Sequence, residues 1–440
     1  MGSRLPAQRF KPYSAYKDSG VEWLGEIPAH WDISPLFTVA RERDVQNKRG
    51  NETNVLSLSY GRIVHRDVSD NFGLMPESFD TYQIVEPDNI VLRLTDLQND
   101  KRSLRVGFVH KRGIITSAYL ALSVHARIVP AFAFYLLHSY DVTKVFYALG
   151  GGVRQTMKFD DLKWMPLLLP EEPEQRAIAA FLDRETARID ALVAKKERLI
   201  ELLQEKRAAL IDQAVTKGLD PTVPMKDSGV EWLGEIPAHW EAKPFTKCAI
   251  EKSDYRGKTP EKVVSGVFLV TAKNVRMGLI DYACSQEFVA EQDYLEIMRR
   301  GLPKKGDILF TTEAPLGNVA LVDREDIALA QRIIRFRVDG KQLVPRFTLF
   351  AMMSGYFQSQ LFTLSTGSTA EGLKASKLTM LRLAAAPIYE QPIIVDFVDR
   401  EIAKIDVLVD KIRAAIDRLK ELRIALISAA VTGKIDVRGR

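Results

Sequence analysis

KDSGVEWLGEIPAHW runs from Lys17 to Trp31 and occurs again, unchanged, from Lys226 to Trp240. Two identical stretches of 15 residues, 209 positions apart, do not arise by chance, so the chain is a tandem duplication. The two copies contain four of the five tryptophans of the chain, namely Trp23, Trp31, Trp232 and Trp240. The duplication predicts that one structural frame is built twice.

A second repeat follows the first at an offset of 216 residues. Glu174-Gln175 and Phe181–Glu185 (FLDRE) in the first half correspond to Glu390-Gln391 and Phe397–Glu401 (FVDRE) in the second half. The same offset relates a third pair of segments, Ala214–Thr216 and Ala430–Thr432. Because the halves barely resemble each other between these anchors, we expect a shared frame that holds two different domains.

Composition predicts a soluble, cytoplasmic protein of several domains. The chain has 440 residues, 46% of them hydrophobic, which is enough for more than one core. A net charge of +5 permits nucleic-acid binding without arguing for it. Cys248 and Cys284 are the only cysteines and form no CxxC pair, so no disulfide framework is expected. The first residues lack the apolar core of a secretory signal, and no stretch is apolar enough to span a membrane.

Two long helices are predicted, one in each half. The segment from Glu174 to about Lys217 has helical periodicity and contains no proline or glycine, whereas Gly218 follows it directly. In the second half, apolar residues recur every seven positions, as in a coiled coil. Each helix would have about 40 residues and a length of about 60 Å. The seam residues are Leu182, Ile189, Leu203 and Leu210 in the first helix and Val398, Ile405, Ile412, Leu419 and Leu426 in the second.

A helix of this length with a single apolar seam needs a partner, and the nearest one is the other copy. We therefore expect an antiparallel coiled coil within the chain, although each helix could instead pack on its own globular domain. The predicted fold class is α/β, with two mixed α/β domains joined by two long antiparallel helices in an internal pseudo-two-fold repeat. The predicted boundaries are 1–170 and 221–388 for the two globular domains and 171–220 and 389–440 for the two helical segments.

Within the globular blocks, short apolar runs predict strands and two longer runs predict helices. The expected strands are Asn54–Ser59, Asn89–Leu94, Ile114–Val124, Val267–Thr271, Asp307–Thr312 and Arg332–Arg337. The expected helices are Pro130–Leu137 and Pro345–Met353.

Catalytic motifs are missing from the sequence. Gly257-Lys258-Thr259 resembles the end of a phosphate-binding loop, but Lys252 stands where its first glycine belongs. There is no HExxH motif, no metal-ligand spacing of histidines and cysteines, and no GxSxG motif, so no catalytic or metal-binding residue is predicted. His30 and His239 lie in the repeat and are expected to stabilise a turn.

The order of these segments closely resembles that of the specificity subunit of Type I restriction–modification systems. In the first half, the repeat is followed by Gly152 and Gln155, by the step Pro166–Pro170 (PLLLP) and by Glu174-Gln175. The second half contains phrases similar to those of target-recognition domains in that family: DYRGKTPEK (Asp254–Lys262), AKNVRMGLID (Ala272–Asp281), KGDILFTTEAPLGNVA (Lys305–Ala320) and LAQRIIRFR (Leu329–Arg337). One departure is Glu371, which stands where the first half has Gln155, and phosphate would repel its carboxylate.

The resemblance implies an architecture and a set of partners. Two target-recognition domains would each read one half of a bipartite DNA sequence, and the two helices would act as a spacer between them. Two methyltransferase (M) subunits would bind the repeated parts, and restriction (R) subunits would join them. The chain would be non-catalytic and hold no cofactor of its own, because S-adenosylmethionine, ATP and Mg²⁺ would belong to the partners. Two copies of one surface independently suit two copies of one partner.

Residues that could contact DNA are basic, amide and hydroxyl side chains in the variable blocks, since such groups reach base edges or phosphates. In the first block the candidates are Tyr60, Arg62, Arg93, Thr95, Lys101, Arg102, Ser117, Tyr119, Gly152, Arg154 and Gln155. In the second block they are Tyr255, Arg256, Lys258, Thr259, Lys273, Asn274, Arg276, Thr312, Gln331, Arg332 and Ser368. Any one of these basic residues could equally be an ordinary solvated surface residue.

The repeated tryptophans and the function each have competing interpretations. Trp23, Trp31 and their copies could seat each domain on the helix pair or contact the methyltransferase, because exposed aromatic residues are favoured at interfaces. A chain that itself methylates or cuts DNA is disfavoured by the missing motifs. A purely structural coiled-coil protein would leave the divergence of the two blocks unexplained, and salt-dependent binding of duplex DNA would separate it from a DNA reader.

Overall fold

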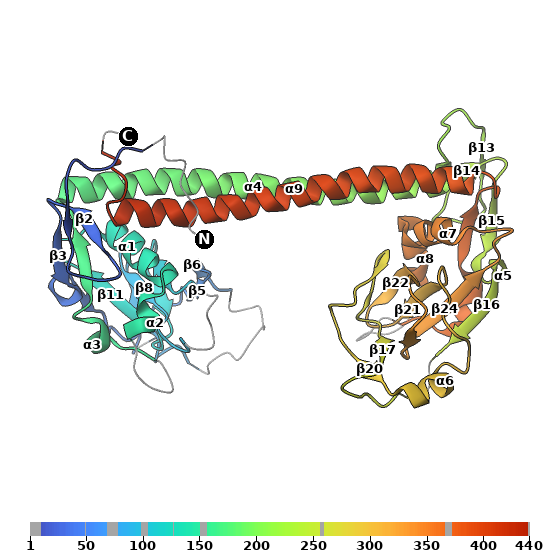
Figure 1. Ribbon diagram of the computed structural model, residues 1–440, viewed down its shortest axis with the longest axis horizontal. Helices are drawn as coiled ribbons and strands as arrows, with labels where there is room; N and C mark the ends of the chain where they lie inside the picture. The colour runs from blue at the N-terminus through green and yellow to red at the C-terminus, as the bar shows by residue number, and fades with distance from the viewer. Residues whose placement is uncertain are drawn as a thin grey trace. The chain divides into compact units, whose positions relative to one another are not determined.

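The computed structural model describes residues 10–48, 50–67, 78–97, 104–125, 127–149, 156–255, 259–365 and 372–438. These residues form two compact units. Unit 1 comprises Met1–Lys196 and Arg413–Arg440, and unit 2 comprises Glu197–Ile412. Each unit therefore contains one globular block together with a part of each long helix, whose labels appear in Figure 1.

Both predicted long helices are present, as α4 (Glu172–Lys217) and α9 (Gln391–Val431). Helix α4 begins two residues earlier than predicted and takes Pro173 into its first turn, where the missing N–H of a proline is not needed. Gly218 follows its end with a φ of +73°, the left-handed conformation that glycine adopts most easily. The predicted seam residues of both helices are buried or half-buried.

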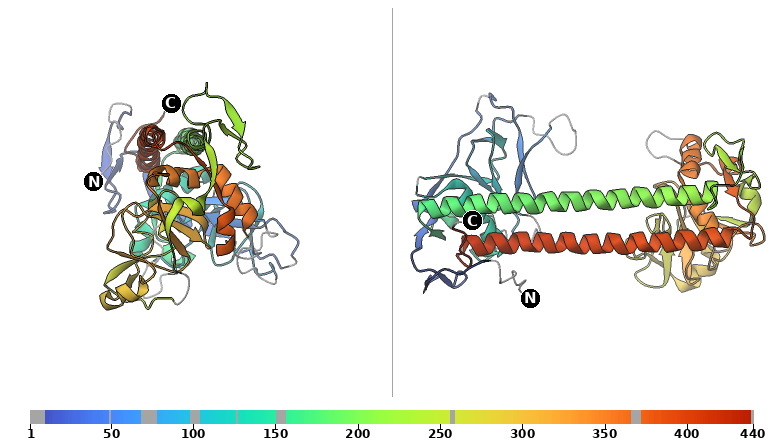
Figure 2. Two further views of the ribbon diagram at one scale, coloured as in Figure 1. Left: turned by 90° about the vertical axis from the view of Figure 1, so that its right-hand side faces the viewer. Right: turned by 90° about the horizontal axis from the view of Figure 1, so that it is seen from above.

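In each unit the two helices contribute to a single core. In unit 1, Ile178 and Leu182 near the start of α4 belong to the same cluster as Leu426 and Ala430 near the end of α9. The right-hand view of Figure 2 shows these two helix ends beside each other. In unit 2, the end of α4 and the start of α9 share a core in the same way, through Ile211, Ala214, Val398 and Ile402.

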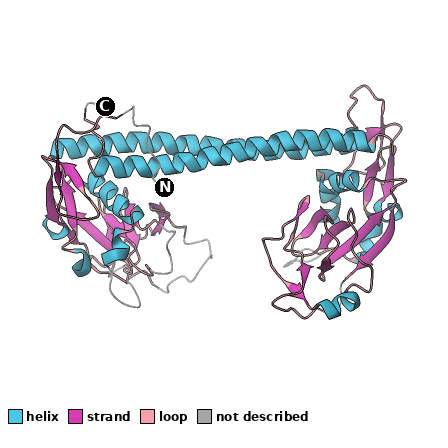
Figure 3. Cartoon of the chain, in the orientation of Figure 1, coloured by secondary structure: helices cyan, strands magenta, loops and turns pink. Residues whose placement is uncertain are grey.

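The same four-stranded antiparallel sheet occurs in both units (Figure 3). In unit 1 its order is β4-β11-β8-β9, and in unit 2 it is β16-β24-β21-β22. The bounds in unit 1 are β4 Ala40–Glu42, β8 Ile90–Leu92, β9 Val106–Phe108 and β11 Leu120–Val124. The bounds in unit 2 are β16 Ala249–Asp254, β21 Ile308–Thr312, β22 Leu316–Leu321 and β24 Ile333–Val338.

Two smaller pairings are also repeated. The 15-residue repeat forms a hairpin in each unit, and the strand that follows the hairpin pairs with the strand that leads into the long helix. The hairpins are β1 (Tyr16–Asp18) with β2 (Glu26–Pro28) and β13 (Met225–Asp227) with β14 (Glu235–Pro237). The following pairs are β3 (Asp32–Pro35) with β12 (Pro166–Leu169) and β15 (Glu241–Pro244) with β25 (Arg382–Ala385).

The remaining strands differ between the units, whereas α1 and α7 begin beside equivalent glutamines. Unit 1 has the pairs β5 (Leu56–Ser59) with β6 (Arg62–His65) and β7 (Gln83–Val85) with β10 (Gly113–Ile115), and the helices α1 (Pro130–Val142), α2 (Val145–Leu149) and α3 (Phe159–Leu162). Unit 2 has the sheets β20-β17-β23 and β18-β19, built from β17 (Val267–Val270), β18 (Val275–Arg276), β19 (Leu279–Ile280), β20 (Phe288–Val289) and β23 (Ile327–Leu329). Its helices are α5 (Phe245–Cys248), α6 (Tyr294–Ile297), α7 (Pro345–Met353) and α8 (Gly355–Leu364).

The strand and helix predictions are confirmed except at one place. A single strand over Ile114–Val124 was wrong, because the chain makes β10 and β11 there and turns between them. The Tyr119 N–H donates to the carbonyl oxygen of Thr116, and the Ser117 hydroxyl donates to the carbonyl oxygen of Thr81. Thr116-Ser117, at the turn itself, is the only polar interruption before Ser123, and the strands on both sides of it are largely buried, so the break resembles a continuous strand in the sequence. Among the described residues, no helix is long and apolar enough to cross a membrane.

Gln175 and Gln391 explain why the Glu–Gln pair is repeated. The Gln175 side chain is 1% exposed; its Oε1 accepts from the Val129 N–H at 2.7 Å, and its Nε2 donates to the Pro170 carbonyl at 2.8 Å. Gln391 makes the matching bonds, to the Val344 N–H at 2.7 Å and to the Ala386 carbonyl at 2.8 Å. Each amide therefore joins the start of a long helix to the strand before it and to the first turn of α1 or α7.

Replacing either glutamine by methionine should destabilise its unit. Gln175→Met or Gln391→Met keeps the volume but leaves buried backbone groups without partners, which should lower the free energy of unfolding by about 2–4 kcal/mol. Urea unfolding of the full chain would measure the loss. Gln204→Met, at an exposed position of α4, is the control and should change stability by less than about 0.5 kcal/mol. Equal effects of all three substitutions would contradict the assigned role.

His138 predicts an acid-sensitive step in unit 1. This α1 residue is 4% exposed, and neither ring nitrogen has a hydrogen-bond partner among the described residues. Burial, helped by the positive charge of Arg423, lowers the pKa of His138 to about 4. The unfolded chain takes up this proton near pH 6.5 and the folded chain only near pH 4, so stability present above pH 6.5 is lost between those values.

Stability measured by urea unfolding should thus fall by about 3 kcal/mol more between pH 7 and pH 4 in the wild type than in His138→Leu. The substitution removes the titrating group and should flatten that part of the pH profile. His110→Leu, which removes an exposed histidine of the same unit, should leave the profile unchanged. Identical profiles for His138→Leu and the wild type would contradict the assignment.

Candidate nucleic-acid interface

In unit 1 the candidate residues gather at one end of the four-stranded sheet. Strands β8 and β11 are antiparallel neighbours, so the residues after β8 lie at the same end as those before β11. Arg93 and Thr95 follow β8, and Ser117 and Tyr119 precede β11. Ser117 is exposed and the other three are half-buried, which leaves their polar atoms close to the surface.

A third segment reaches the same end of the sheet. The backbone N–H of Met157 donates to the carbonyl oxygen of Leu94 at 3.0 Å. This bond brings the chain that follows Gly152, Arg154 and Gln155 next to the loop after β8. Those three candidates, with Lys101 and Arg102, lie outside the described residues.

Gln83 was missed from the sequence, although it shapes this site. It is 4% exposed, and its Nε2 donates to the carbonyl oxygens of Thr116 at 3.1 Å and Tyr119 at 2.5 Å. These bonds hold the turn that presents Ser117. The available signal was its position in a short apolar strand, because a buried amide there requires partners.

Tyr60 and Arg62 lie on the β5–β6 hairpin. Tyr60 is 82% exposed, with a φ of +46°, and Arg62 begins β6. The Arg62 Nη2 is 2.8 Å from the Asp190 Oδ2 on α4, in an ion pair that is largely exposed. Such pairs contribute little to stability, so the guanidinium is available to an incoming phosphate.

Unit 2 has the same arrangement with different side chains. Thr312 ends β21, and Gln331 and Arg332 precede β24, its antiparallel neighbour. The Leu373 N–H donates to the Thr312 carbonyl at 3.0 Å, which matches the bond between Met157 and Leu94 in unit 1. Three segments therefore meet at the same end of the same sheet in both units.

Four of the candidates in unit 2 line one cavity of about 280 Å³: Thr259, Lys273, Gln331 and Arg332. Arg332 has a φ of +76°, and its Nε is 3.1 Å from the Glu313 Oε1. A neighbouring cavity of about 600 Å³ shares Thr259 and Gln331 and adds Arg299 and Arg300. This surface combines carboxylates, among them Glu261 and Glu296, with an amide, a hydroxyl and several cations. The amide, the hydroxyl and the cations are groups that bind bases and phosphates.

Three candidates are engaged inside the protein. Asn274 is fully buried: its Oδ1 accepts from the N–H of Thr271 at 2.9 Å, and its Nδ2 donates to the carbonyl of Asp281 at 2.9 Å. Tyr255 is 7% exposed, burial raises its pKa, and its hydroxyl donates to the Gly301 carbonyl. Thr312 is 2% exposed. Because these side chains stabilise loops and the sheet end, we leave them out of the proposed DNA-contacting set.

The remaining candidates of unit 2 are less informative. Arg276 is half exposed, its Nη2 lies 2.9 Å from the sulfur of Cys284, and it does not line either cavity. Arg256, Lys258 and Ser368 lie outside the described residues, as does Glu371. Among the described residues, no group of three or more His, Cys, Asp or Glu side chains is placed to hold a metal ion.

The four repeated tryptophans divide into two kinds. Trp31 and Trp240 are fully buried, and the Trp240 Nε1 donates to the Glu390 Oε2 at 3.0 Å. Trp23 and Trp232 are each 42% exposed. The two tryptophans that end the repeat therefore seat it on the frame, and the two within the hairpin loop remain accessible.

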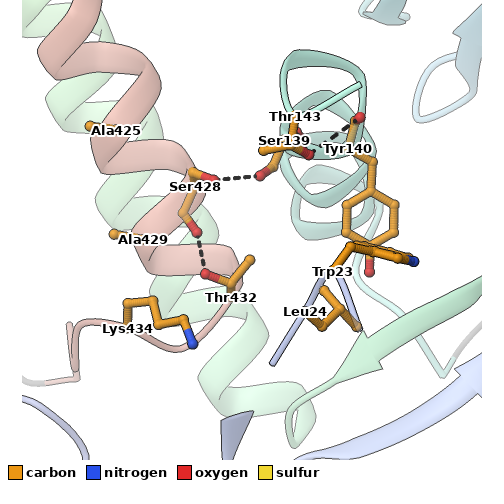
Figure 4. A pocket seen from close by; sticks show the side chains of 10 residues that line it. All are labelled: Trp23, Leu24, Ser139, Tyr140, Thr143, Ala425, Ser428, Ala429, Thr432 and Lys434. Carbon is orange, nitrogen blue, oxygen red and sulfur yellow. Dashed lines mark hydrogen bonds between the residues drawn. The ribbon is translucent and has the colours of Figure 1, made fainter. Parts of the chain in front are cut away.

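The surroundings of the hairpin loop are clearest in unit 1. Trp23 packs edge-on against Tyr140 at 4.5 Å between ring centroids and lines a cavity of about 350 Å³ with Ser139 and Ser428 (Figure 4). The hydroxyls of these two serines are 2.8 Å apart, which joins α1 to α9.

His30 and His239 make the same contact in the two units. The His30 Nε2 is 2.8 Å from the Glu174 Oε2, and the His239 Nε2 is 2.7 Å from the Glu390 Oε1. Each histidine connects the end of the repeat to the glutamate beside the start of a long helix, which agrees with its predicted structural role.

Comparison with known families shows which class of protein this chain resembles. Residues 289–418 match the family model described as Type I restriction modification DNA specificity domain. The stretch begins at the end of β20 and continues into α9, so it includes Gln331, Arg332 and the first part of the second helix. The match thus covers the four-stranded sheet of unit 2 from β21 onward and the helices that follow it.

Whole-chain relatives agree with the domain match. The chain is 25% identical over 367 residues to the Type I restriction enzyme MjaVIII specificity subunit of Methanocaldococcus jannaschii, covering 81% of each chain. It is 21% identical over 441 residues to the EcoKI specificity subunit of Escherichia coli (strain K12), covering 94% of this chain and 91% of that one. The resemblance to Type I restriction–modification specificity subunits is thereby confirmed.

A solved structure supports the fold. A chain from a study of complex assembly and conformational transition of the type I R-M system matches with a TM-score of 0.66. The match covers 92% of this chain and 98% of that chain, at 14% sequence identity. At this identity the likeness shows the mixed α/β fold alone.

Proposed function

We propose that this chain is the sequence-reading, non-catalytic subunit of a Type I restriction–modification complex and that it recognises a bipartite DNA target. Each unit reads one half-site with the segments that meet at the end of its four-stranded sheet. The observation that carries the proposal is that repetition: the same sheet end receives three segments in both units, but the side chains there differ. Equal frames with unequal side chains suit two different half-sites.

Two kinds of DNA contact are assigned to this surface. Arg93, Thr95 and Ser117 in unit 1 and Gln331 and Arg332 in unit 2 contact base edges, because arginine pairs with guanine and glutamine with adenine. The lysines and arginines around them, among them Lys273 and Arg300, contact phosphates and set the register without reading sequence.

The long helices act as a spacer between the readers. Helix α4 is continuous over 46 residues and contributes to the cores of both units, and the seam residues of both helices are buried or half-buried. These observations support an antiparallel coiled coil with pseudo-two-fold symmetry. A fixed helical spacer would set the gap between half-sites, as protein geometry does in dimeric regulators.

The complex acts in the cytoplasm, and its chemistry belongs to the partners. Two methyltransferase subunits dock on the repeated surfaces, and restriction subunits join them. S-adenosylmethionine, ATP and Mg²⁺ are bound by these partners rather than by this chain. The names of the matched relatives, each a specificity subunit of a restriction enzyme, support this division of labour.

The proposal predicts a two-part methylation motif in host DNA. Methylation-sensitive long-read sequencing of cells with the gene intact should reveal two short sequences separated by a fixed gap, and deletion of the gene should abolish the motif. Absence of such a motif in cells that demonstrably express an active methyltransferase partner would contradict the proposal.

A variant in one reader sharpens this test. Gln331→Ala should relax one or two positions of a single half-site, with a loss of discrimination of about 1–3 kcal/mol per position, and should leave the other half-site unchanged. Gln204→Ala, which removes an exposed glutamine of α4 outside both readers, should leave both half-sites intact.

The repeated loop predicts how the partner docks. Changing both Trp23 and Trp232 to alanine should reduce co-purification of the methyltransferase at least tenfold, because exposed aromatic residues commonly dominate interface energies. The double variant should stay folded, with a modest loss of stability from the lost contact between Trp23 and Tyr140, since both tryptophans are 42% exposed. Trp164→Ala is the control: this residue is 68% exposed but lies outside the repeat. Equal retention of the partner by the double variant and the control would contradict the assignment.

A further inference from the structure

Arg105 is a buried arginine whose guanidinium faces the loop after β8. The residue has no exposed surface and directly precedes β9. Its Nη1 donates to the carbonyl oxygens of Arg93 at 3.0 Å and Thr95 at 2.8 Å, and its Nη2 donates to that of Asp96 at 3.2 Å. One side chain thus holds three carbonyl groups of the same short loop.

The loop itself has no regular structure to define it. Asp96 adopts a φ of +56°, which residues other than glycine rarely adopt without support from their surroundings. The one carbonyl between the arginine-bound ones, that of Leu94, accepts from the Met157 N–H at 3.0 Å. All four carbonyl groups from Arg93 to Asp96 therefore have a partner inside the protein, and the loop is held in one shape.

Arg105 is itself anchored to two helices. Its Nε donates to the Tyr147 hydroxyl of α2 at 3.0 Å, and its backbone N–H donates to the Asp141 Oδ2 of α1 at 2.6 Å. Asp141 is 1% exposed. Arg105 thus connects the loop to helices α1 and α2 in the core of unit 1.

The sheet does not require an arginine at this place. Val106 pairs with Leu92 across β8 and β9, and Val319 pairs with Phe310 across β21 and β22, so the residue that corresponds to Arg105 in unit 2 is Asn318. Asn318 donates instead to the carbonyl oxygen of Val275 at 2.8 Å. Since both units form the same sheet, the buried charge of Arg105 serves the loop that is particular to unit 1.

We propose that Arg105 is a positioning residue that fixes the loop Arg93–Leu97 and thereby sets base discrimination in the first half-site. This inference rests on the proposed function. Burial of a guanidinium is unfavourable unless its donors are satisfied, and here three bonds of the guanidinium go to the backbone of the loop that carries the candidate residues Arg93 and Thr95, and one goes to the Tyr147 hydroxyl. Lysine cannot replace it, because a single ammonium group cannot match a planar fork that binds three carbonyls.

The test is a selection of target sequences from a random duplex pool by the full-length chain in complex with its methyltransferase. Arg105→Lys should lower discrimination at one or two positions of a single half-site at least tenfold and leave discrimination in the other half-site within twofold. Tyr147→Phe removes only the hydroxyl that accepts from Arg105 and should shift the same positions by a smaller factor. Tyr147→Phe can still test the inference if Arg105→Lys does not fold.

Arg335→Lys is the matched control. Arg335 is equally buried, but its guanidinium bonds the side chains of Asp307 at 2.6 Å and Ser253 at 2.7 Å in unit 2. The variant Arg335→Lys should leave base discrimination unchanged in the half-site that Arg105→Lys affects. A purely structural role of Arg105 would instead lower total binding with equal discrimination at every position, and that result would overturn the inference.

The outcomes separate the inference from the function on which it rests. If the wild type selects a two-part motif and both Arg105→Lys and Tyr147→Phe select it with unchanged discrimination, the positioning role is overturned and the proposed function stands. If the wild type selects no motif, the proposed function fails and the inference fails with it.

Discussion

The structure depends on two buried glutamine side chains, Gln175 and Gln391, at the points where the long helices begin. Each amide connects three segments: the end of the strand before the long helix, the helix itself, and the start of a helix in the globular block 46 or 47 residues earlier in the chain. A side chain with both a donor and an acceptor group can do this, whereas an apolar residue would leave buried backbone groups unsatisfied. This junction makes each globular block and its helix end one core.

Residues at that junction are constrained by packing, whereas the loops at the sheet end are not. His30 and His239 make equivalent contacts in the two units, and Trp31 and Trp240 are both fully buried, because the same junction is built twice. The loops at the sheet end are free of this requirement. They are supported by Gln83 and Arg105 in unit 1 and by other residues in unit 2, so the two surfaces can diverge while the frame stays the same.

The sequence predicts the long helices well because their periodicity extends over some 40 residues and their ends carry proline and glycine. Most of the strands that it predicts are present, but it predicts neither the other strands of the two units nor the order of the strands in the sheet. It also misses the break between β10 and β11, because two short buried strands in succession resemble a single strand. It also does not separate the arginines and asparagines that face solvent from those that serve the interior. Asn274 looks like a base-reading residue by type and is entirely occupied in stabilising its own loop.

Buried polar side chains have a particular role in this fold, because they hold the loops at the sheet end in place. Loops that read DNA need surface side chains in fixed positions, yet short irregular loops have no internal hydrogen-bond ladder to fix them. The core must supply the missing donors, at the cost of placing amides and a guanidinium where apolar groups would otherwise pack. Gln83 under the turn at Ser117 and Arg105 under the loop at Thr95 are two such donors in unit 1. Under the proposed function, buried polar side chains that bond loop carbonyls therefore mark the reading surface alongside the exposed charges.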